Sequence, residues 1–300
     1  MSITSNFIQV LGVRTHYLTA GAEGSPVLLL HGGGTDSAWL SWSLAAPALA
    51  QTHRVIAPDW PGYGDSERPD VGYSTDYYVG FLLEFMARLD LPRASLVGIS
   101  MGGAIALGAI LRQPERVERL VLVDSYGLQP TAPAHKLSWL FVRLPGVNAL
   151  TWALVRNSRA MARASLTGIF HDPRRVTDDL VDQVLAEMRK PRTGAAFMAF
   201  QRHDIQWQGL RTFYLDRLHE IAAPALIIHG ERDSLVPLAC ARQAQQRIRG
   251  ARLEALPGCG HWPQREKPEE FNRLVASFLA AEEPPVLRPP AGGGGQPDHA

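Results

Sequence analysis

The chain has 300 residues, 46% of them hydrophobic and 20% charged, so it can bury a large core. Its 30 basic and 29 acidic residues give a net charge of +1, which excludes the strongly basic composition of many nucleic-acid-binding proteins. We expect a small-molecule partner, no nucleic acid and no membrane, and a homo-oligomer is compatible with the sequence. Without a signal-peptide pattern or a run of about 18 apolar residues, the sequence predicts a cytoplasmic protein.

Short β-prone segments and helical patterns alternate along the chain. Residues 7–10 and 15–18 flank Leu11-Gly12 and predict a hairpin. Apolar runs without alternation then predict strands covered on both faces, at residues 27–30, 55–57, 96–97, 120–123 and 225–228. Helices are predicted at residues 77–89, 103–112, 238–248 and 268–280. This alternation predicts an α/β fold with a mostly parallel sheet.

The alternation stops between residues 128 and 219. Helices are predicted there at residues 136–143, 149–164 and 178–189, and no comparable strand occurs. We interpret this region as a helical cap inserted into a core made of residues 1–127 and 220–281. Residues 282–300 are rich in Pro and Gly and predict a disordered tail.

A G-x-S-x-G motif, Gly98-Ile99-Ser100-Met101-Gly102, joins a predicted strand to a predicted helix. In that context the turn is tight enough to hold the serine in a strained conformation, and only small neighbours fit beside it. The motif does not match the phosphate-binding glycine loops. Ser100 is therefore predicted to be a nucleophile at the carboxyl end of the sheet.

A serine nucleophile needs a base and an acid that orients the base. His261 is the predicted base, because it follows a glycine-bearing loop and precedes a predicted helix. Asp233 is the predicted acid, because it lies three residues beyond Gly230 at the end of a strand. Asp124, at the end of another strand, is the alternative acid.

The third requirement is stabilisation of the oxyanion that forms when the serine attacks. Three glycines follow residues 27–30, and their bare backbone can approach a substrate oxygen closely. We predict an oxyanion hole made of the N–H groups of Gly33 and Met101, with Gly34 as the neighbour that could replace Gly33. His31 is interpreted as a brace for this loop. No metal or organic cofactor is needed for this chemistry.

These motifs resemble the α/β-hydrolase superfamily over residues 7–127 and 220–280, and the order Ser100, Asp233, His261 is the one expected of that superfamily. The resemblance implies an α/β-hydrolase fold with a cap. More narrowly, the serine motif and the stretch Cys259-Gly260-His261-Trp262 resemble meta-cleavage-product hydrolases, which split carbon–carbon bonds of dienoic ketoacids. This implies that Trp262 binds substrate.

In those hydrolases the residue before the serine is commonly asparagine, and the cap supplies an arginine for the substrate carboxylate. The corresponding positions here hold Ile99 and Val184. For that reason the sequence favours a serine esterase acting on small carboxylic esters through an acyl-enzyme. The alternatives are carbon–carbon hydrolysis of meta-cleavage products and a non-catalytic binding protein of the same fold.

Overall fold

A computed structural model describes residues 2–281, so the predicted tail at 282–300 lies outside the described residues. In the described chain one sheet of eight strands has the order β1-β2-β4-β3-β5-β6-β7-β8. The strands are β1 (Thr4–Val10), β2 (Val13–Ala20), β3 (Pro26–Leu30), β4 (Arg54–Pro58), β5 (Ala94–Ile99), β6 (Val117–Val123), β7 (Ala225–Gly230) and β8 (Arg252–Leu256). Strands β3 to β8 are parallel, and β2 is antiparallel to both of its neighbours, β1 and β4. The predicted α/β class is confirmed.

The predicted hairpin forms around Leu11 and Gly12, which both have positive φ and close the turn between β1 and β2. Each of the five predicted parallel strands is present. Strand β8 was not predicted. It lies at the edge of the sheet, and only Leu256 among its residues is fully buried, so it lacks the continuous apolar run of the other strands.

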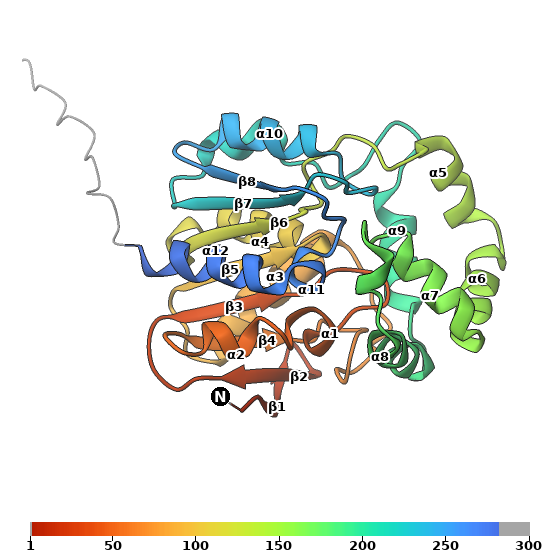
Figure 1. Ribbon diagram of the computed structural model, residues 1–300, viewed down its shortest axis with the longest axis horizontal. Coiled ribbons are helices and arrows are strands. Elements are labelled where there is room, and N and C mark those ends of the chain that lie inside the picture. Colours follow the sequence, from red (N-terminus) through yellow and green to blue (C-terminus); the bar gives the residue numbers. More distant parts are fainter. Residues whose placement is uncertain (1, 282–300) are drawn as a thin grey trace, which may run out of the picture.

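Both faces of the sheet are buried, because alternate side chains of each strand point to opposite sides. Leu28 and Leu30 pack with α3 (Thr75–Arg88), α4 (Met101–Arg112) and α10 (Leu238–Arg247). Val27 and Leu29 pack on the other face with α1 (Ala38–Trp42), α2 (Ala46–Leu49) and α12 (Pro268–Ala280). The short helix α11 (Pro263–Glu266) precedes α12. The core is thus a sheet between two helical layers (Figure 1).

Between β6 and β7 the chain is mostly helical, and Figure 1 shows these helices gathered at one end of the sheet. They are α5 (His135–Arg143), α6 (Val147–Asn157), α7 (Arg159–Thr167), α8 (Asp178–Arg189) and α9 (Ala195–Asp204). The single helix predicted at 149–164 is wrong, because Ser158 ends α6 and caps α7 by accepting a hydrogen bond from the N–H of Met161. Helix α9 was not predicted. The division into core and cap at residues 128 and 219 stays a prediction.

Within residues 2–281, none of the helices is both long and apolar enough to cross a bilayer.

Candidate active site

Ser100 occupies the sharp turn between β5 and α4. Its φ of 49° and ψ of −118° lie outside the regions that L-residues normally adopt. The turn is held by hydrogen bonds from the Ser100 N–H to the carbonyl of Val123 (3.0 Å) and from the Tyr126 N–H to the carbonyl of Ser100 (3.1 Å). The neighbouring strand β6 and the segment after it therefore fix the conformation that exposes the hydroxyl.

The glycines of the motif are required by close backbone approach. A Cβ added to Gly98 would lie 2.4 Å from the carbonyl oxygen of Gly102, and one added to Gly102 would lie 2.2 Å from that of Leu30. Real Cβ atoms do not approach backbone oxygens so closely, and a backbone atom cannot rotate away. The steric reason predicted for these glycines is confirmed.

His261 and Asp233 meet beyond the ends of β8 and β7. The Nδ1 of His261 lies 2.8 Å from Oδ2 of Asp233, whose carboxylate also accepts hydrogen bonds from the N–H groups of Leu235 and Val236. Burial opposes ionisation of Asp233, but the His261 charge and hydrogen bond outweigh it and lower the pKa of the carboxyl below its usual value. An ionised Asp233 keeps the proton on Nδ1 and leaves Nε2 as the ring nitrogen that can accept one.

The loop that carries His261 is fastened to the helical region. The His261 N–H donates to the carbonyl of Ile169 (2.7 Å). Glu266 is buried at the end of α11 and accepts hydrogen bonds from the N–H groups of Gly260 and Asp172, both at 2.7 Å. Sequence reasoning missed Glu266, whose role depends on a contact 94 residues away along the chain. These bonds fix the position of the histidine.

The predicted oxyanion donors lie after β3 and at the start of α4. Among the described residues, no hydrogen-bond acceptor is recorded for the N–H of Gly33 or of Met101, so both are available to a ligand. The N–H of Gly32 is occupied by Oδ2 of Asp36 (2.8 Å). A Cβ on Gly33 would lie 2.6 Å from the Phe197 ring, whereas one on Gly34 would meet nothing within 4 Å. Gly34 has φ of +75°, a conformation that glycine adopts readily.

His31 and Asp36 shape the glycine loop from beneath. His31 is fully buried, donates from Nδ1 to the carbonyl of Gly32 (2.8 Å) and accepts at Nε2 from the N–H of Trp60 (3.1 Å). Burial lowers the pKa of His31 to about 4, so the ring is neutral and acts as a brace. Burial likewise raises the pKa of Asp36 to about 7, against the hydrogen bonds it accepts from Ser41, Ser37 and Gly32. No local pattern in the sequence pointed to Asp36.

The alternative acid, Asp124, lies near the same cluster without bonding to His261. Its Oδ1 accepts from the N–H of Gly230 (3.0 Å) and lies 3.6 Å from Nε2 of His229. Burial and then the nearby charge of Asp233 raise the pKa of Asp124 far above its usual value. His229 donates to the carbonyl of Val236 (2.9 Å). The geometry therefore joins Asp233, and not Asp124, to the histidine.

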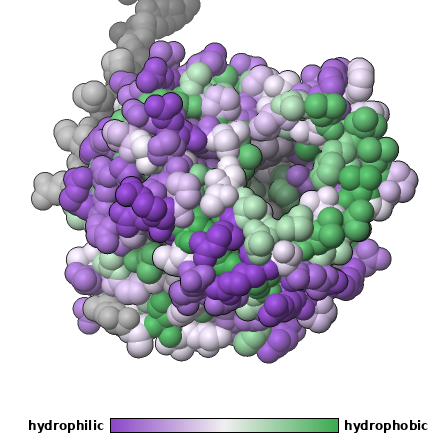
Figure 2. Space-filling view, turned by 45° about the vertical axis from the view of Figure 1, so that its right-hand side comes forward, coloured by the Kyte–Doolittle hydropathy of each residue, from purple (hydrophilic) through white to green (hydrophobic). Residues whose placement is uncertain are grey.

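One cavity of about 470 Å³ connects these groups with the helical region. It is lined from the sheet side by Gly33, Gly34, Ser100, Met101, His261 and Trp262, and from the helical side by Trp152, Val155, Leu166, Val184, Met188 and Phe197. Figure 2 shows a hollow on this side of the molecule, next to a band of hydrophobic surface. Within the described chain, none of the residues that line the cavity is Lys or Arg. Ile99 and Val184 both lie in its wall.

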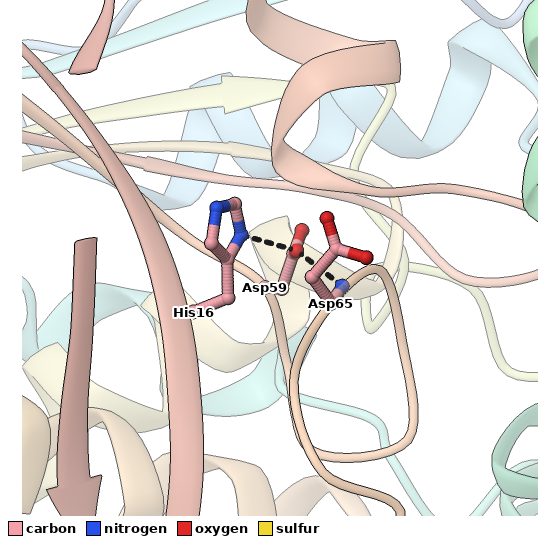
Figure 3. Close-up of side chains that lie close together, drawn as sticks. All are labelled: His16, Asp59 and Asp65. Carbon is pink, nitrogen blue, oxygen red and sulfur yellow. Dashed lines mark hydrogen bonds and ion pairs between the residues drawn. The ribbon is translucent and has the colours of Figure 1, made fainter. Parts of the chain in front are cut away.

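A second cluster of polar side chains lies away from the cavity (Figure 3). His16 bonds through Nδ1 to Oδ2 of Asp59 (2.7 Å), which also accepts from the backbone N–H of Asp65 (2.8 Å). The carboxylate of Asp65 pairs with Lys190, at the end of α8 (2.8 Å). The spacing of the three side chains is compatible with a cation. Because each carboxylate already has a protein partner, the cluster fastens the loop after β4 to β2 and to the helical region.

Comparison with known proteins assigns the chain to a family. The profile of the family described as "alpha/beta hydrolase fold" matches residues 25–268. The chain belongs to the α/β-hydrolase family. This confirms the recognised superfamily and the fold class, and it makes the chain a member of a family of hydrolases.

The hydrolase is also similar to named relatives over nearly its whole length. It is 35% identical over 277 residues to a 2-hydroxymuconate semialdehyde hydrolase of Pseudomonas sp. strain CF600, with 90% of this chain and 91% of that protein covered. It is 33% identical over 275 residues to a 2-hydroxy-6-oxo-2,4-heptadienoate hydrolase of Pseudomonas putida, covering 91% and 95%. A solved meta-cleavage product hydrolase from Pseudomonas fluorescens IP01 superposes with a TM-score of 0.78 at 32% identity, covering 91% and 97%. These relatives favour the alternative of carbon–carbon hydrolysis over the ester hydrolysis that the sequence favoured.

Proposed function

We propose that this hydrolase cleaves a carbon–carbon bond next to a ketone in a meta-cleavage product, a 2-hydroxy-6-oxo-dienoate or a close analogue. The observation that carries the proposal is similarity to hydrolases of such compounds along about nine-tenths of the chain. The cavity supports it, because Ser100, His261 and Trp262 all line the same space.

In the proposed mechanism His261 removes the proton of Ser100, and Oγ adds to the ketone carbon. The N–H groups of Gly33 and Met101 hold the oxygen that gains the negative charge. The dienol first shifts its hydroxyl proton to the carbon next to the ketone, which leaves a carbonyl at position 2. The carbon–carbon bond then breaks, its electron pair passes into this conjugated carbonyl to give a dienolate, and the 2-oxygen takes the proton from His261. Water activated by His261 hydrolyses the acyl-enzyme, while Asp233 keeps the imidazole oriented and stabilises its cation.

Hydrolysis of a neutral ester is a second candidate, and one observation favours it. A dienoate carries a carboxylate, but no Lys or Arg occurs among the described residues of the cavity wall. The same nucleophile, base and oxyanion donors serve both reactions, because the two reactions differ only in whether the atom that leaves the carbonyl carbon is a carbon or an oxygen. The choice therefore depends on what the wall of the cavity accepts.

The decisive experiment compares kcat/KM for a dienoic ring-fission product, for its methyl ester and for short p-nitrophenyl esters. The proposal expects the dienoic acid to have the highest kcat/KM of the three. Its turnover is measured from the decay of its absorbance. Exclusive turnover of the neutral esters would establish the second candidate instead. Ser100→Ala is expected to abolish every activity, whereas Ser165→Ala, which alters another serine of the cavity wall, is expected to retain it. Absence of labelling of Ser100 by a fluorophosphonate, together with no turnover, would identify a non-catalytic binding protein.

A further inference from the structure

Helices α5 and α6 expose the side that helices of this pattern normally bury. In α5 and the residue after it, Leu137, Leu140, Phe141 and Leu144 recur at the spacing i, i+3, i+4, i+7, which places them on one helical face. Such a face usually packs on a core, yet all four side chains are exposed, and Leu137 is 69% exposed.

The following helix repeats the arrangement. Val147, Leu150 and Leu154 share one face of α6, and Leu150 is 61% exposed. The two helices pack against each other. We call these seven side chains of α5 and α6 the outer apolar face. Figure 2 shows hydrophobic surface gathered on this side of the molecule.

The two helices that carry this face contain basic residues and no acidic ones, which the balanced composition of the whole chain conceals. Residues 128–171 contain five Lys and Arg and no Asp or Glu. Arg159 and Arg163 pair with Asp178 on α8, which leaves Lys136, Arg143 and Arg156 as the cations of α5 and α6.

Two of these cations lie on aromatic rings. The Nζ of Lys136 is 3.7 Å from the centre of the Trp207 ring, and the guanidinium of Arg143 is 4.8 Å from that of Trp139. Trp207 is itself half exposed. Exposed leucines, basic side chains and interfacial tryptophans together are typical of helices that lie in the surface of a bilayer.

We propose that the outer apolar face docks on the surface of an anionic lipid bilayer. The leucines would enter the boundary between headgroups and acyl chains, and the basic side chains would contact anionic headgroups. A second copy of this chain fits less well, because a two-fold contact brings the same patch against itself and so sets cations against cations. This inference departs from the expectation that no membrane is involved.

The position of α6 suggests what docking would achieve. Leu150 and Leu154 face solvent, while Thr151, Trp152 and Val155 of the same helix line the cavity. Docking would therefore place one wall of the cavity against the bilayer, where the neutral esters of the second candidate function concentrate and an anionic dienoate does not. This benefit rests on that second candidate function, but binding to lipid rests on neither candidate, so the two can fail separately.

The test is co-flotation of the full chain with lipid vesicles. We expect binding to vesicles of equal parts phosphatidylglycerol and phosphatidylcholine, and much weaker binding to pure phosphatidylcholine. Raising NaCl from about 0.1 M to about 1 M shortens the screening length from about 10 Å to about 3 Å and is expected to release much of the protein. Leu137→Gln combined with Leu150→Gln is expected to weaken partitioning by about tenfold or more.

A control variant distinguishes binding by this face from non-specific hydrophobic binding to lipid. Leu11→Gln alters a leucine that is 57% exposed in the hairpin turn and is expected to leave vesicle binding unchanged. Equal loss in the control and in the double variant would overturn the proposal. The proposal would also be overturned if the protein bound neither kind of vesicle. Self-association of the protein that the double variant abolishes, without any binding to vesicles, would show that the face contacts a second copy instead. Circular dichroism of each variant checks that the fold is retained.

Discussion

The variant Gly33→Ala tests whether Gly33 is an oxyanion donor, because its new side chain would collide with Phe197. The added Cβ would lie 2.6 Å from Cε2 of Phe197, and the two carbons must separate by about 0.8 Å to reach ordinary contact at 3.4 Å. Because Phe197 comes from α9 and stacks on Phe200, part of that movement falls on the glycine loop. A donor misplaced by about 1 Å costs roughly 10²-fold in rate, or about 3 kcal/mol, so a loop that takes up about half of the 0.8 Å loses about tenfold.

The assay is kcat on whichever substrate is turned over, and the expected result is a loss of about tenfold with the fold intact. Phe197→Ala combined with Gly33→Ala removes the ring and is expected to restore most of the loss. Gly34→Ala is the matched control, because its Cβ meets nothing and only its positive φ costs about 1 kcal/mol of stability. Wild-type kcat in Gly33→Ala, or no recovery in the double variant, would refute the assignment of Gly33 as a donor.

Three further outcomes are expected. Asp233→Asn lowers kcat by about 10³- to 10⁴-fold, whereas Asp124→Asn changes it less than about tenfold, because only Asp233 bonds His261, the predicted base. Folding lowers the pKa of His31 from 6.5 to about 4, so between these pH values the unfolded chain binds a proton that the folded chain does not. The free energy of unfolding therefore falls by about 3 kcal/mol as the pH drops from 6.5 to about 4. Urea unfolding of His31→Gln is expected to lack this fall. Gly102→Ala destabilises the fold by about 2 kcal/mol or more in the same assay, while Gly80→Ala in α3, whose Cβ would meet only Arg112 at an ordinary 3.9 Å, is neutral or stabilising.

The parts of the fold that the sequence predicted are those with a local signal. Buried parallel strands show continuous apolar runs, and the serine turn requires glycines at fixed spacing, so both could be recognised within a few residues. Strand β8 was not predicted, because an edge strand buries few side chains. The break between α6 and α7 at Ser158 was not predicted either, because the apolar pattern continues across it.

The candidate site was predictable only where a residue's role depends on its immediate neighbours. Ser100, Asp233 and His261 each follow a strand in a recognisable turn. Glu266 and Phe197 act through residues far away in the chain, which no local pattern reveals. The exposed apolar side of α5 and α6 was not predicted, and its spacing could not have shown that it faces outward, because the same spacing is typical of a buried helix.

The two hydrogen bonds that join the segment after α7 to the histidine loop limit how the enzyme can admit a substrate. Ile169 holds the backbone of His261, and Asp172 is held by Glu266. A hinge at this seam would move His261, the predicted general base, away from Ser100 whenever it opened. A substrate that enters through the hollow seen in Figure 2 leaves the seam closed, so the predicted proton-transfer groups stay in place between turnovers.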